Sequence, residues 1–480
     1  MAETGKAERS YLGLKETVLY GVANGGQVFG ITMVTTYVTY FLVNIFHIDT
    51  RYVSVMLFIE GMWDTFNDPL MGSIVDRTRT RYGKLRPYLL GVPIPHALMT
   101  ILFFAGPLLI PSTSDKSPAK IIYMIVTYFF WEFFYTIGDV PFWGMSAAVS
   151  PNPADRTKAI SSARLISSVI GSIPTIIIPI LLDSTMASGG EANLKVTFFV
   201  LGTVTSVFGM GLFSLSGLFV KERVVYSTEE PSFRDCLNHI IKNPPLRLII
   251  LKEVIMAFSG VGGVFATFYY IDVLHFASAS IVTMVPVAVV GIFAFMLIPF
   301  AKKHFNNRQL VITSSLFTAL VNLLVYFAGL KSYTNTAVMI PLLMLNSGLP
   351  AIFSAIGAVI PTEMIGETVD YMEWKTGLRN EGVSFAVLTF IGKFAGAVSR
   401  SLGTALLPVI GYKTSHTSAI IPQSPATMRN IWFMFMAAPV LFRVLGTIPM
   451  FFYDLVGEKR ERMLSDLAVR RAKLTQEVSH

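Results

Sequence analysis

The sequence predicts an all-α membrane protein in which twelve transmembrane helices form two pseudo-symmetric halves of six helices each. Of its 480 residues, 53% are hydrophobic and only 14% are charged, and the mean hydropathy is +0.59. Soluble domains carry about 25% charged residues. The apolar residues fall into runs that can each cross a hydrocarbon core about 30 Å thick. The longest polar connection divides these runs into two equal sets, which predicts the two halves.

The spans follow from the apolar runs between polar or Pro-rich connections. We place them at 17–46, 52–74, 87–111, 118–147, 158–183, 195–220, 247–274, 278–300, 309–330, 335–360, 381–410 and 430–453. The connection 221–246 separates an N-terminal half, 1–220, from a C-terminal half, 247–453. The polar tail, 454–480, is expected to form a helix at the cytoplasmic surface. The sequence has no strong internal repeat, so the predicted symmetry rests on the layout of the spans alone.

The basic residues predict the orientation. The tail and the connections on the same side as the two termini carry 26 Lys and Arg residues, and the opposite connections carry seven. Short cytoplasmic connections are enriched in Lys and Arg. We therefore expect a multi-pass protein of the cell (inner) membrane with both termini in the cytoplasm. The same pattern accounts for the formal net charge of +8 without nucleic acid as a partner.

Composition disfavours two other classes of protein. The only cysteine is Cys236, and no pair of the seven histidines has the spacing of zinc ligands. A membrane enzyme would need a nucleophile with a base, or a set of metal ligands, so we do not expect an enzyme. A sensor would be expected to carry a soluble signalling module, and no polar segment is long enough for one. We also expect no cofactor other than a coupling ion. The lipid bilayer is an expected partner, and we infer no obligate protein partner.

Carboxylates inside the second span indicate a functional site. Asp64 and Asp68 lie one helical turn apart on one face, and Glu60 continues that face one turn earlier. A bare carboxylate in hydrocarbon costs several kcal/mol, so such groups usually face the interior of a bundle and mark an ion or substrate path. A single acid could be the structural partner of a basic residue, but a row of acids favours a cation or proton site.

Span four carries a second polar face. Tyr135, Asp139 and Trp143 are spaced by four residues. A carboxylate that accepts hydroxyl hydrogen bonds beside aromatic faces is typical of a sugar site. An aromatic core stripe beside a structural aspartate fits the same residues equally well, so both interpretations stay open here. Glu132 is either a further polar residue of a cavity or a group at a helix end.

Span eleven carries a lysine. Thr389 and Lys393 lie one turn apart. We expect the Lys393 ammonium to neutralise one or more acids of spans two and four.

Three blocks in chain order carry a resemblance to a known family. They are Trp63-Asp64-xx-Asn67-Asp68-Pro69-xx-Gly72 with the following Asp76–Pro87 run, Tyr135-Thr136-xx-Asp139-x-Pro141-Phe142-Trp143, and Val369-Asp370-Tyr371-x-Glu373-x-Lys375-xxx-Arg379. They resemble the glycoside–pentoside–hexuronide:cation symporters, a branch of the major facilitator superfamily whose best-known member is the melibiose permease. The resemblance extends over essentially the whole chain.

The resemblance implies a role for each matched residue. Asp64, Asp68 and Thr136 would bind or couple the cation, and Lys393 would link the cation and sugar sites. The substrate site would comprise Asp139, Trp143, Arg164, Tyr135, Thr389, Asn24 and Gln27. Matched cytoplasmic gate segments would contain Asp76, Arg77, Arg81 and Lys84 in one half, and Asp370, Glu373 and Arg379 in the loop before span eleven.

Span one departs from the family pattern. Family members carry an acid here, whereas this chain has Ala23-Asn24 and Gln27-Val28, so span one supplies no carboxylate. A specificity like that of the melibiose permease is therefore not expected. The resemblance implies a secondary transporter that imports a sugar or glycoside with Na⁺ or H⁺ by alternating access. Neutral glycosides or pentosides are favoured over anionic hexuronides, and a lipid or lysolipid carrier is the remaining alternative.

Overall fold

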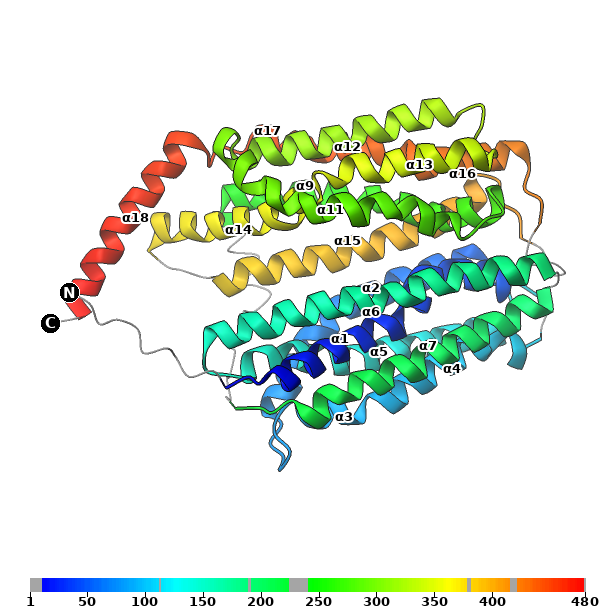
Figure 1. Cartoon of the computed structure of the whole chain (residues 1–480), viewed down its shortest axis with the longest axis horizontal. Helices are drawn as coiled ribbons and strands as arrows, with labels where there is room; N and C mark the ends of the chain where they lie inside the picture. The colour runs from blue at the N-terminus through cyan, green and yellow to red at the C-terminus, as the bar shows by residue number, and fades with distance from the viewer. Residues whose placement is uncertain are drawn as a thin grey trace. The chain divides into compact units, whose positions relative to one another are not determined.

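A computed structural model describes residues 11–111, 114–188, 191–223, 241–377, 381–414 and 421–478. In these ranges the chain is helical apart from its connections and forms two compact units, one containing α1 to α7 and the other α9 to α18. The first unit, blue to green in Figure 1, consists of α1 (Leu14–Tyr40) with the π-helical turn η1 (Phe41–Ile45), α2 (Thr50–Arg77), α3 (Arg86–Gly91), α4 (Pro93–Leu109), α5 (Pro118–Ala148), α6 (Pro153–Ser188) and α7 (Glu191–Phe219).

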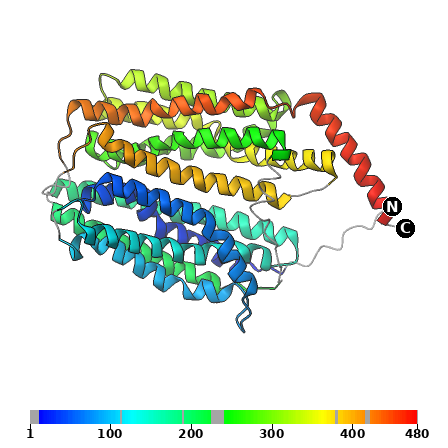
Figure 2. The same ribbon diagram turned by 180° about the vertical axis from the view of Figure 1, so that it is seen from behind.

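The second unit, green to red in Figures 1 and 2, has more broken helices. It consists of α9 (Pro244–Ala257), η2 (Phe258–Gly260), α10 (Val261–Phe268), η3 (Tyr269–Val273), α11 (Ala279–His304), α12 (Asn307–Gly329), α13 (Thr336–Ala351), α14 (Ser354–Thr376), α15 (Glu381–Val409), α16 (Pro425–Met436), α17 (Ala438–Phe451) and α18 (Gly457–Val478).

Helices occupy all twelve predicted span positions. By length and hydropathy, seven of the described helical segments can cross a membrane on their own, or nine if two bent pairs each count as one span. The other three positions are α2, α3 with α4, and α15. In α2 the acids on one face lower the hydropathy, and α4 is short. The predicted all-α fold is confirmed, and twelve spans are consistent with it.

One predicted boundary is wrong. The segment that begins at Val369 was expected to be a loop before span eleven, but α14 continues to Thr376 and ends at Gly377, whose φ of 78° is left-handed. Such a residue is the usual helix C-cap. Asp370 and Glu373 are therefore helical residues. The polar composition of this stretch therefore does not mark a loop.

A local motif recurs in the two units although the sequence shows no strong repeat. A π-helical turn follows α1 at Phe41–Ile45 and follows α10 at Tyr269–Val273. Two residues after each turn is a histidine with positive φ, His47 at 53° and His275 at 50°. Such values are uncommon for residues other than glycine. The match supports an internal symmetry of the chain that is carried by backbone conformation more than by residue identity.

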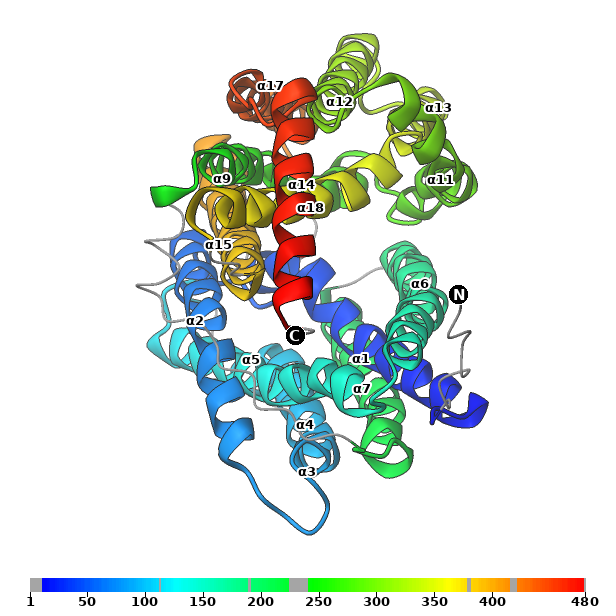
Figure 3. The ribbon, with the colours of Figure 1, turned by 90° about the vertical axis from the view of Figure 1, so that its left-hand side faces the viewer.

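Glycines on α1 allow this helix to pack closely against its neighbours, and this packing sets the position of the polar residues of α1. Helix α1 packs against both α6 and α7, as the view along the bundle in Figure 3 shows. A Cβ atom on Gly26 would lie 2.5 Å from the carbonyl oxygen of Gly209, and one on Gly209 would lie 2.5 Å from that of Gly26. Small residues permit such close approach of helices in membranes. Gln27, the next residue along α1, is thereby held inside the first unit.

The tail helix α18 packs on the second unit. Met463 and Leu467 are fully buried in a cluster with residues of α14. Arg460 forms an ion pair with Glu367 at 2.7 Å, and Trp374 Nε1 donates to Asp466 at 3.0 Å. These two apolar residues of the tail are therefore covered by protein.

Candidate functional site

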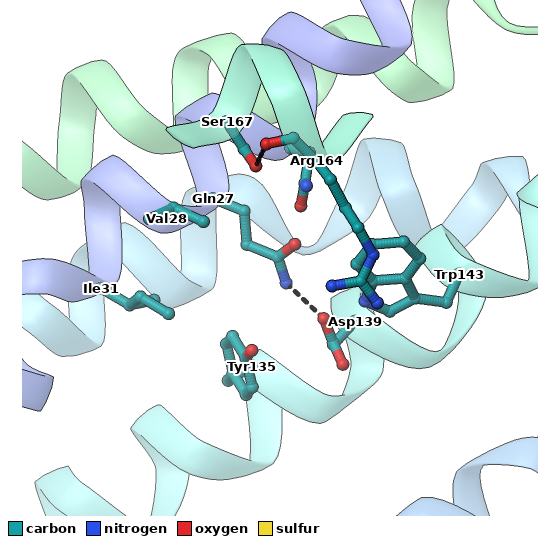
Figure 4. A pocket seen from close by; sticks show the side chains of 9 residues that line it. Gln27, Val28, Ile31, Tyr135, Asp139, Trp143, Arg164 and Ser167 are labelled. Carbon is teal, nitrogen blue, oxygen red and sulfur yellow. Dashed lines mark hydrogen bonds between the residues drawn. The ribbon is translucent and has the colours of Figure 1, made fainter. Parts of the chain in front are cut away.

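A cavity of about 260 Å³ lies inside the first unit (Figure 4). This volume is just below the about 300–1,000 Å³ typical of pockets for drug-sized ligands. Helices α1, α5 and α6 supply its wall, which is formed by Asn24, Gln27, Val28, Ile31, Tyr135, Asp139, Trp143, Arg164 and Ser167. Six of these nine are predicted substrate residues, so the structure brings together residues from three distant parts of the sequence.

Three lining residues were missed by sequence reasoning. Val28 and Ile31 share a side of α1 with Gln27, and Ser167 lies one turn after Arg164 on α6. Their residue types carry no chemical signal, and only their helical spacing from the polar residues could have identified them.

A hydrogen bond joins α1 to α5 across the cavity. Gln27 Nε2 donates to Asp139 Oδ1 at 2.8 Å, as Figure 4 shows. The amide therefore occupies one side of the carboxylate and fixes its orientation. Because the lining contains one acidic and one basic residue, the formal charge of the wall is balanced.

Arg164 lies over the indole of Trp143. Its guanidinium carbon is 5.4 Å from the ring centroid, which is a cation–π geometry. The sequence suggested that a sugar would pack on the Trp143 face. In this structure the guanidinium covers part of that face, so a sugar would use the remaining indole surface or move the arginine aside.

Stacked aromatic rings support Tyr135. Its ring stacks on Trp131, with centroids 6.0 Å apart, and Trp131 stacks on Tyr128 at 5.5 Å. Trp131 Nε1 also donates to Thr100 at 3.1 Å. His96, only 1% exposed, packs beside Trp131 and Tyr135. The aromatic stripe of α5 is thus both packed core and cavity wall, and the role of its residues in sugar binding stays a prediction.

The acids of α2 meet a further acid on α5. Glu132 lies close to Glu60 and Asp64, and Glu60 and Glu132 are both buried. Glu132 is in the middle of α5, so it is not at a helix end, and it is not among the residues that line the cavity described above. The opposite face of α2 carries the exposed residues Phe66, Leu70 and Ile74, as expected of a lipid-facing side.

Thr136 and Asn67 add polar groups on the same two helices. Both are buried, and among the described residues neither the Thr136 hydroxyl nor the Asn67 amide nitrogen has a hydrogen-bond partner. In those residues no three His, Cys, Asp or Glu side chains converge as they would around a bound metal ion.

For Lys393, Thr389, Asp76 and Arg379 the predicted roles stay predictions. Lys393 is a half-buried residue of α15 in the second unit, and its partnership with the acids of the first unit stays a prediction. The Thr389 side chain, the Asp76 side chain and Arg379 lie outside the described residues.

In the first unit, the predicted cytoplasmic gate segment forms hydrogen bonds with Glu222, a residue that sequence reasoning missed. Glu222 accepts hydrogen bonds from the backbone N–H groups of Lys84, Leu85 and Arg86 at 2.8–2.9 Å. Arg77 is exposed, and Arg81, also exposed, lies over the Tyr82 ring at 4.7 Å. In the second unit, Glu373 is buried and its carbonyl accepts from Arg470 at 3.3 Å. These contacts fix each segment within its own unit.

A sequence model of the family described as "MFS/sugar transport protein" matches residues 19–457. The chain belongs to this family. Among curated relatives, the isoprimeverose transporter of Lactiplantibacillus pentosus is 24% identical over 92% of this chain and 88% of its own length. A putative sulfoquinovose importer of Salmonella typhimurium is 24% identical over 96% and 94%. The glucuronide carrier protein homolog of Escherichia coli is 21% identical over 96% of both chains.

Solved structures of two transporters share the fold of this MFS protein. The nucleoside transporter NupG has a TM-score of 0.60 at 13% identity, and the match covers 92% of this chain and 100% of NupG. A bacterial homologue of the human lysosomal transporter Spinster has a TM-score of 0.58 at 15% identity, covering 94% and 97%. The predicted family and fold are confirmed: this is a multi-pass membrane protein of a transporter family.

Proposed function

We propose that this MFS protein is a secondary transporter that imports a sugar or glycoside together with Na⁺ or H⁺ by alternating access. The observation that carries the proposal is the cavity of α1, α5 and α6, in which Asp139, Gln27 and Arg164 surround a space of about 260 Å³ beside Trp143. Membership of a sugar transport family and relatives named for sugars and glycosides support it.

The wall of the cavity matches the chemistry of a sugar. Asp139 accepts hydroxyl protons, and the amides of Asn24 and Gln27 both donate and accept. Tyr135 and Trp143 present apolar ring surface to C–H groups. A lipid or lysolipid carrier would need a wide apolar opening, whereas only Val28 and Ile31 of this lining are aliphatic.

The coupling ion would bind at the acids shared by α2 and α5. Asp64 and Asp68 lie one turn apart on α2, and Thr136 supplies a buried hydroxyl without a hydrogen-bond partner in the described structure. Tyr135, which lines the cavity, directly precedes Thr136 on α5. The proposed ion site and the proposed sugar site would therefore share this helix, which gives the two a direct structural connection.

The coupling step would involve the second half as well. Lys393 would take part as a charge partner, and Thr389 would complete the sugar site. The gate segments around Lys84 and Glu373 would open and close the cytoplasmic side of the transporter during alternating access. Both termini would lie on that side.

Uptake into proteoliposomes tests the proposal. The purified full chain is assayed with radiolabelled neutral glycosides, pentosides and hexuronides, while inward Na⁺ and H⁺ gradients are imposed separately. We expect accumulation of at least one sugar that depends on one of the two gradients and is lost in Asp139→Asn. Accumulation of no sugar under either gradient, or equal accumulation by the variant, would contradict the proposal.

A further inference from the structure

We propose that two bent spans of the second unit share one paired hinge, and that the two pieces beyond the hinge move as a single body. The spans are α11 and the combination of α13 with α14. The pieces before the bends form an anchor pair and those after the bends a gate pair: the anchor pair is Ala279–Gly291 with Thr336–Ala351, and the gate pair is Met296–His304 with Ser354–Thr376. The proposal rests on the alternating access proposed above, which needs a moving part.

The two bends lie at the same level of the unit. α11 bends by 64° after Gly291, and the other span bends by 54° before Ser354. A Cβ atom on Gly291 would lie 3.9 Å from the Ser354 Oγ, so the two bends lie side by side. α11 packs against both α13 and α14 (Figure 3). Two adjacent helices that bend at one level can change direction together and keep their packing on either side of the bend.

Polar and close-packed contacts join the two helices of the anchor pair. Ser347 Oγ on α13 donates a hydrogen bond to the backbone oxygen of Thr283 on α11. The Thr283 hydroxyl is also hydrogen-bonded to the Tyr270 hydroxyl at 2.9 Å. A Cβ atom on Gly348 would lie only 2.7 Å from the Pro286 Cβ, so the two helices approach closely here. The anchor pair is therefore joined internally and attached to η3.

An ion pair joins the two helices of the gate pair. The Lys302 ammonium on α11 lies 2.6 Å from each carboxylate oxygen of Glu363 on α14. Ala301, beside it, packs against a buried cluster that includes residues of α14. Both partners of the ion pair are partly exposed, so its contribution to stability is small. Its consequence is geometric, because it ties the end of α11 to the helix that carries the predicted gate residues Asp370 and Glu373.

The backbone at the bends is less constrained than in a continuous helix. Pro299 has no N–H group, so the carbonyl of Phe295 cannot receive the usual helical hydrogen bond from it. In the other span, the Ile352 and Phe353 N–H groups bond to carbonyls three residues back rather than four. Prolines and such interruptions are usual causes of helix bends. A hinge consists of a few residues that absorb a change in backbone angles, and both bends provide them.

This arrangement predicts a motion within the second unit. When both bends change angle, the gate pair swings as one body and carries Asp370 and Glu373 with it. The ion pair of Lys302 with Glu363 stays formed during this motion, because both partners lie beyond the hinge. The cavity of α1, α5 and α6 is unaffected, because it belongs to the first unit.

Spin-label distances in the purified full chain test the proposal. One label is placed on the anchor pair at Val338 and the other on the gate pair at Lys303 or Thr362, in a chain in which Cys236 is replaced by serine. All three labelled residues are exposed. Double electron–electron resonance gives the distance distribution of each labelled pair in lipid nanodiscs. The conditions are neutral and acidic pH, with and without Na⁺, and with each glycoside, pentoside and hexuronide of the uptake panel.

A continuous helix provides the control. Labels at Gln309 and Phe327 span α12, which has no break, and should give one narrow distribution in every condition. The distributions from Val338 to Lys303 and to Thr362 should be broad or double-peaked. A change of roughly 20° at the bend moves the end of the gate piece of α11 by about 5 Å. We therefore expect peaks about that far apart, which exchange population together for both labelled pairs.

Two sets of variants separate the hinge from the ion pair. Pro299→Ala restores a backbone N–H at the bend and should narrow the distribution; it should slow sugar uptake about tenfold, the effect of one hydrogen bond, with sugar affinity unchanged. Pro361→Ala, in α14 away from the bends, is the matched control and should change neither. Lys302→Glu repels Glu363 and should make the two gate-pair labels shift independently, and adding Glu363→Lys should restore the joint shift.

The outcomes distinguish the hinge from the proposed function. Distributions from Val338 as narrow as that of α12 in every condition would overturn the hinge. Shifts of Lys303 and Thr362 that differ in sense or size while the ion pair is intact would show two independent bends and overturn the single moving body. Either result leaves sugar transport standing. Joint shifts in a chain that transports no sugar would support the hinge and contradict the proposed function.

Discussion

The side-chain amide of Gln27 on α1 donates a hydrogen bond to the carboxylate of Asp139 on α5 at 2.8 Å, across the wall of the cavity. The bond orients Asp139 and occupies one of its oxygens. It joins the polar face of α1, which lacks an acid, to the acidic face of α5 within the described lining.

Loss of this bond should weaken sugar binding. In Gln27→Ala, Asp139 loses the contact that orients it toward the sugar hydroxyls, and we expect the dissociation constant to rise by about tenfold. Titration calorimetry on the purified protein measures it. The matched control is Ser168→Ala, which removes a polar group from α6 at an exposed position outside the lining. An unchanged affinity in Gln27→Ala would show that the bond does not position Asp139.

The acids of α2 should be required for accumulation. Asp64→Asn or Asp68→Asn removes a charge that the coupling ion needs, so uptake against a gradient should be lost while sugar exchange across the membrane persists. Proteoliposomes loaded with unlabelled sugar measure exchange, and an imposed ion gradient measures accumulation. If both variants still concentrate sugar, the ion site is assigned to the wrong residues.

The contact between α1 and α7 should be sensitive to one methyl group. Gly209→Ala places a Cβ 2.5 Å from the Gly26 carbonyl oxygen, and the forced separation of the helices should destabilise the protein by about 1–3 kcal/mol. Gly211→Ala is the control on the same helix, because its Cβ would meet nothing within 4 Å. Thermal unfolding in detergent compares the two. Equal unfolding temperatures would mean that the helices can separate without cost.

The orientation can be tested with single cysteines in a background that lacks Cys236. Tyr82, in the connection between α2 and α3, and Arg51, at the opposite end of α2, are both exposed. With cytoplasmic termini, a membrane-impermeant thiol reagent should label Arg51→Cys in intact cells and should label Tyr82→Cys only after the cells are opened. Labelling of the position 82 cysteine in intact cells would show that the predicted orientation is wrong.

Much of the fold was predictable because hydrophobic runs set helix positions directly. The span predicted at 118–147 is the helix Pro118–Ala148. The error at 369–376 arose because a polar helical stretch lacks an apolar signal although it keeps its backbone hydrogen bonds. The recurring π-helical turns before His47 and His275 were hidden because little side-chain identity accompanies the shared backbone conformation.

The site was predictable to the extent that its chemistry lies in charged and aromatic residues. Asp139, Trp143 and Arg164 stand out in an apolar sequence, and the structure places them around one cavity. Sequence could not show that Arg164 lies on Trp143 or that Glu132 meets the acids of α2, because both relations join different helices. Glu222 was missed because an acid in a polar connection carries no distinguishing signal.

The most direct test of the account is the binding of a sugar to the purified wild-type chain and to Asp139→Asn, measured by calorimetry with the coupling ion present. The account predicts saturable binding of at least one sugar to the wild type, a loss of about tenfold or more in Asp139→Asn, and no change in Ser168→Ala. A sugar that is transported by the wild type and binds Asp139→Asn with unchanged affinity would contradict the assignment of this cavity as the sugar site.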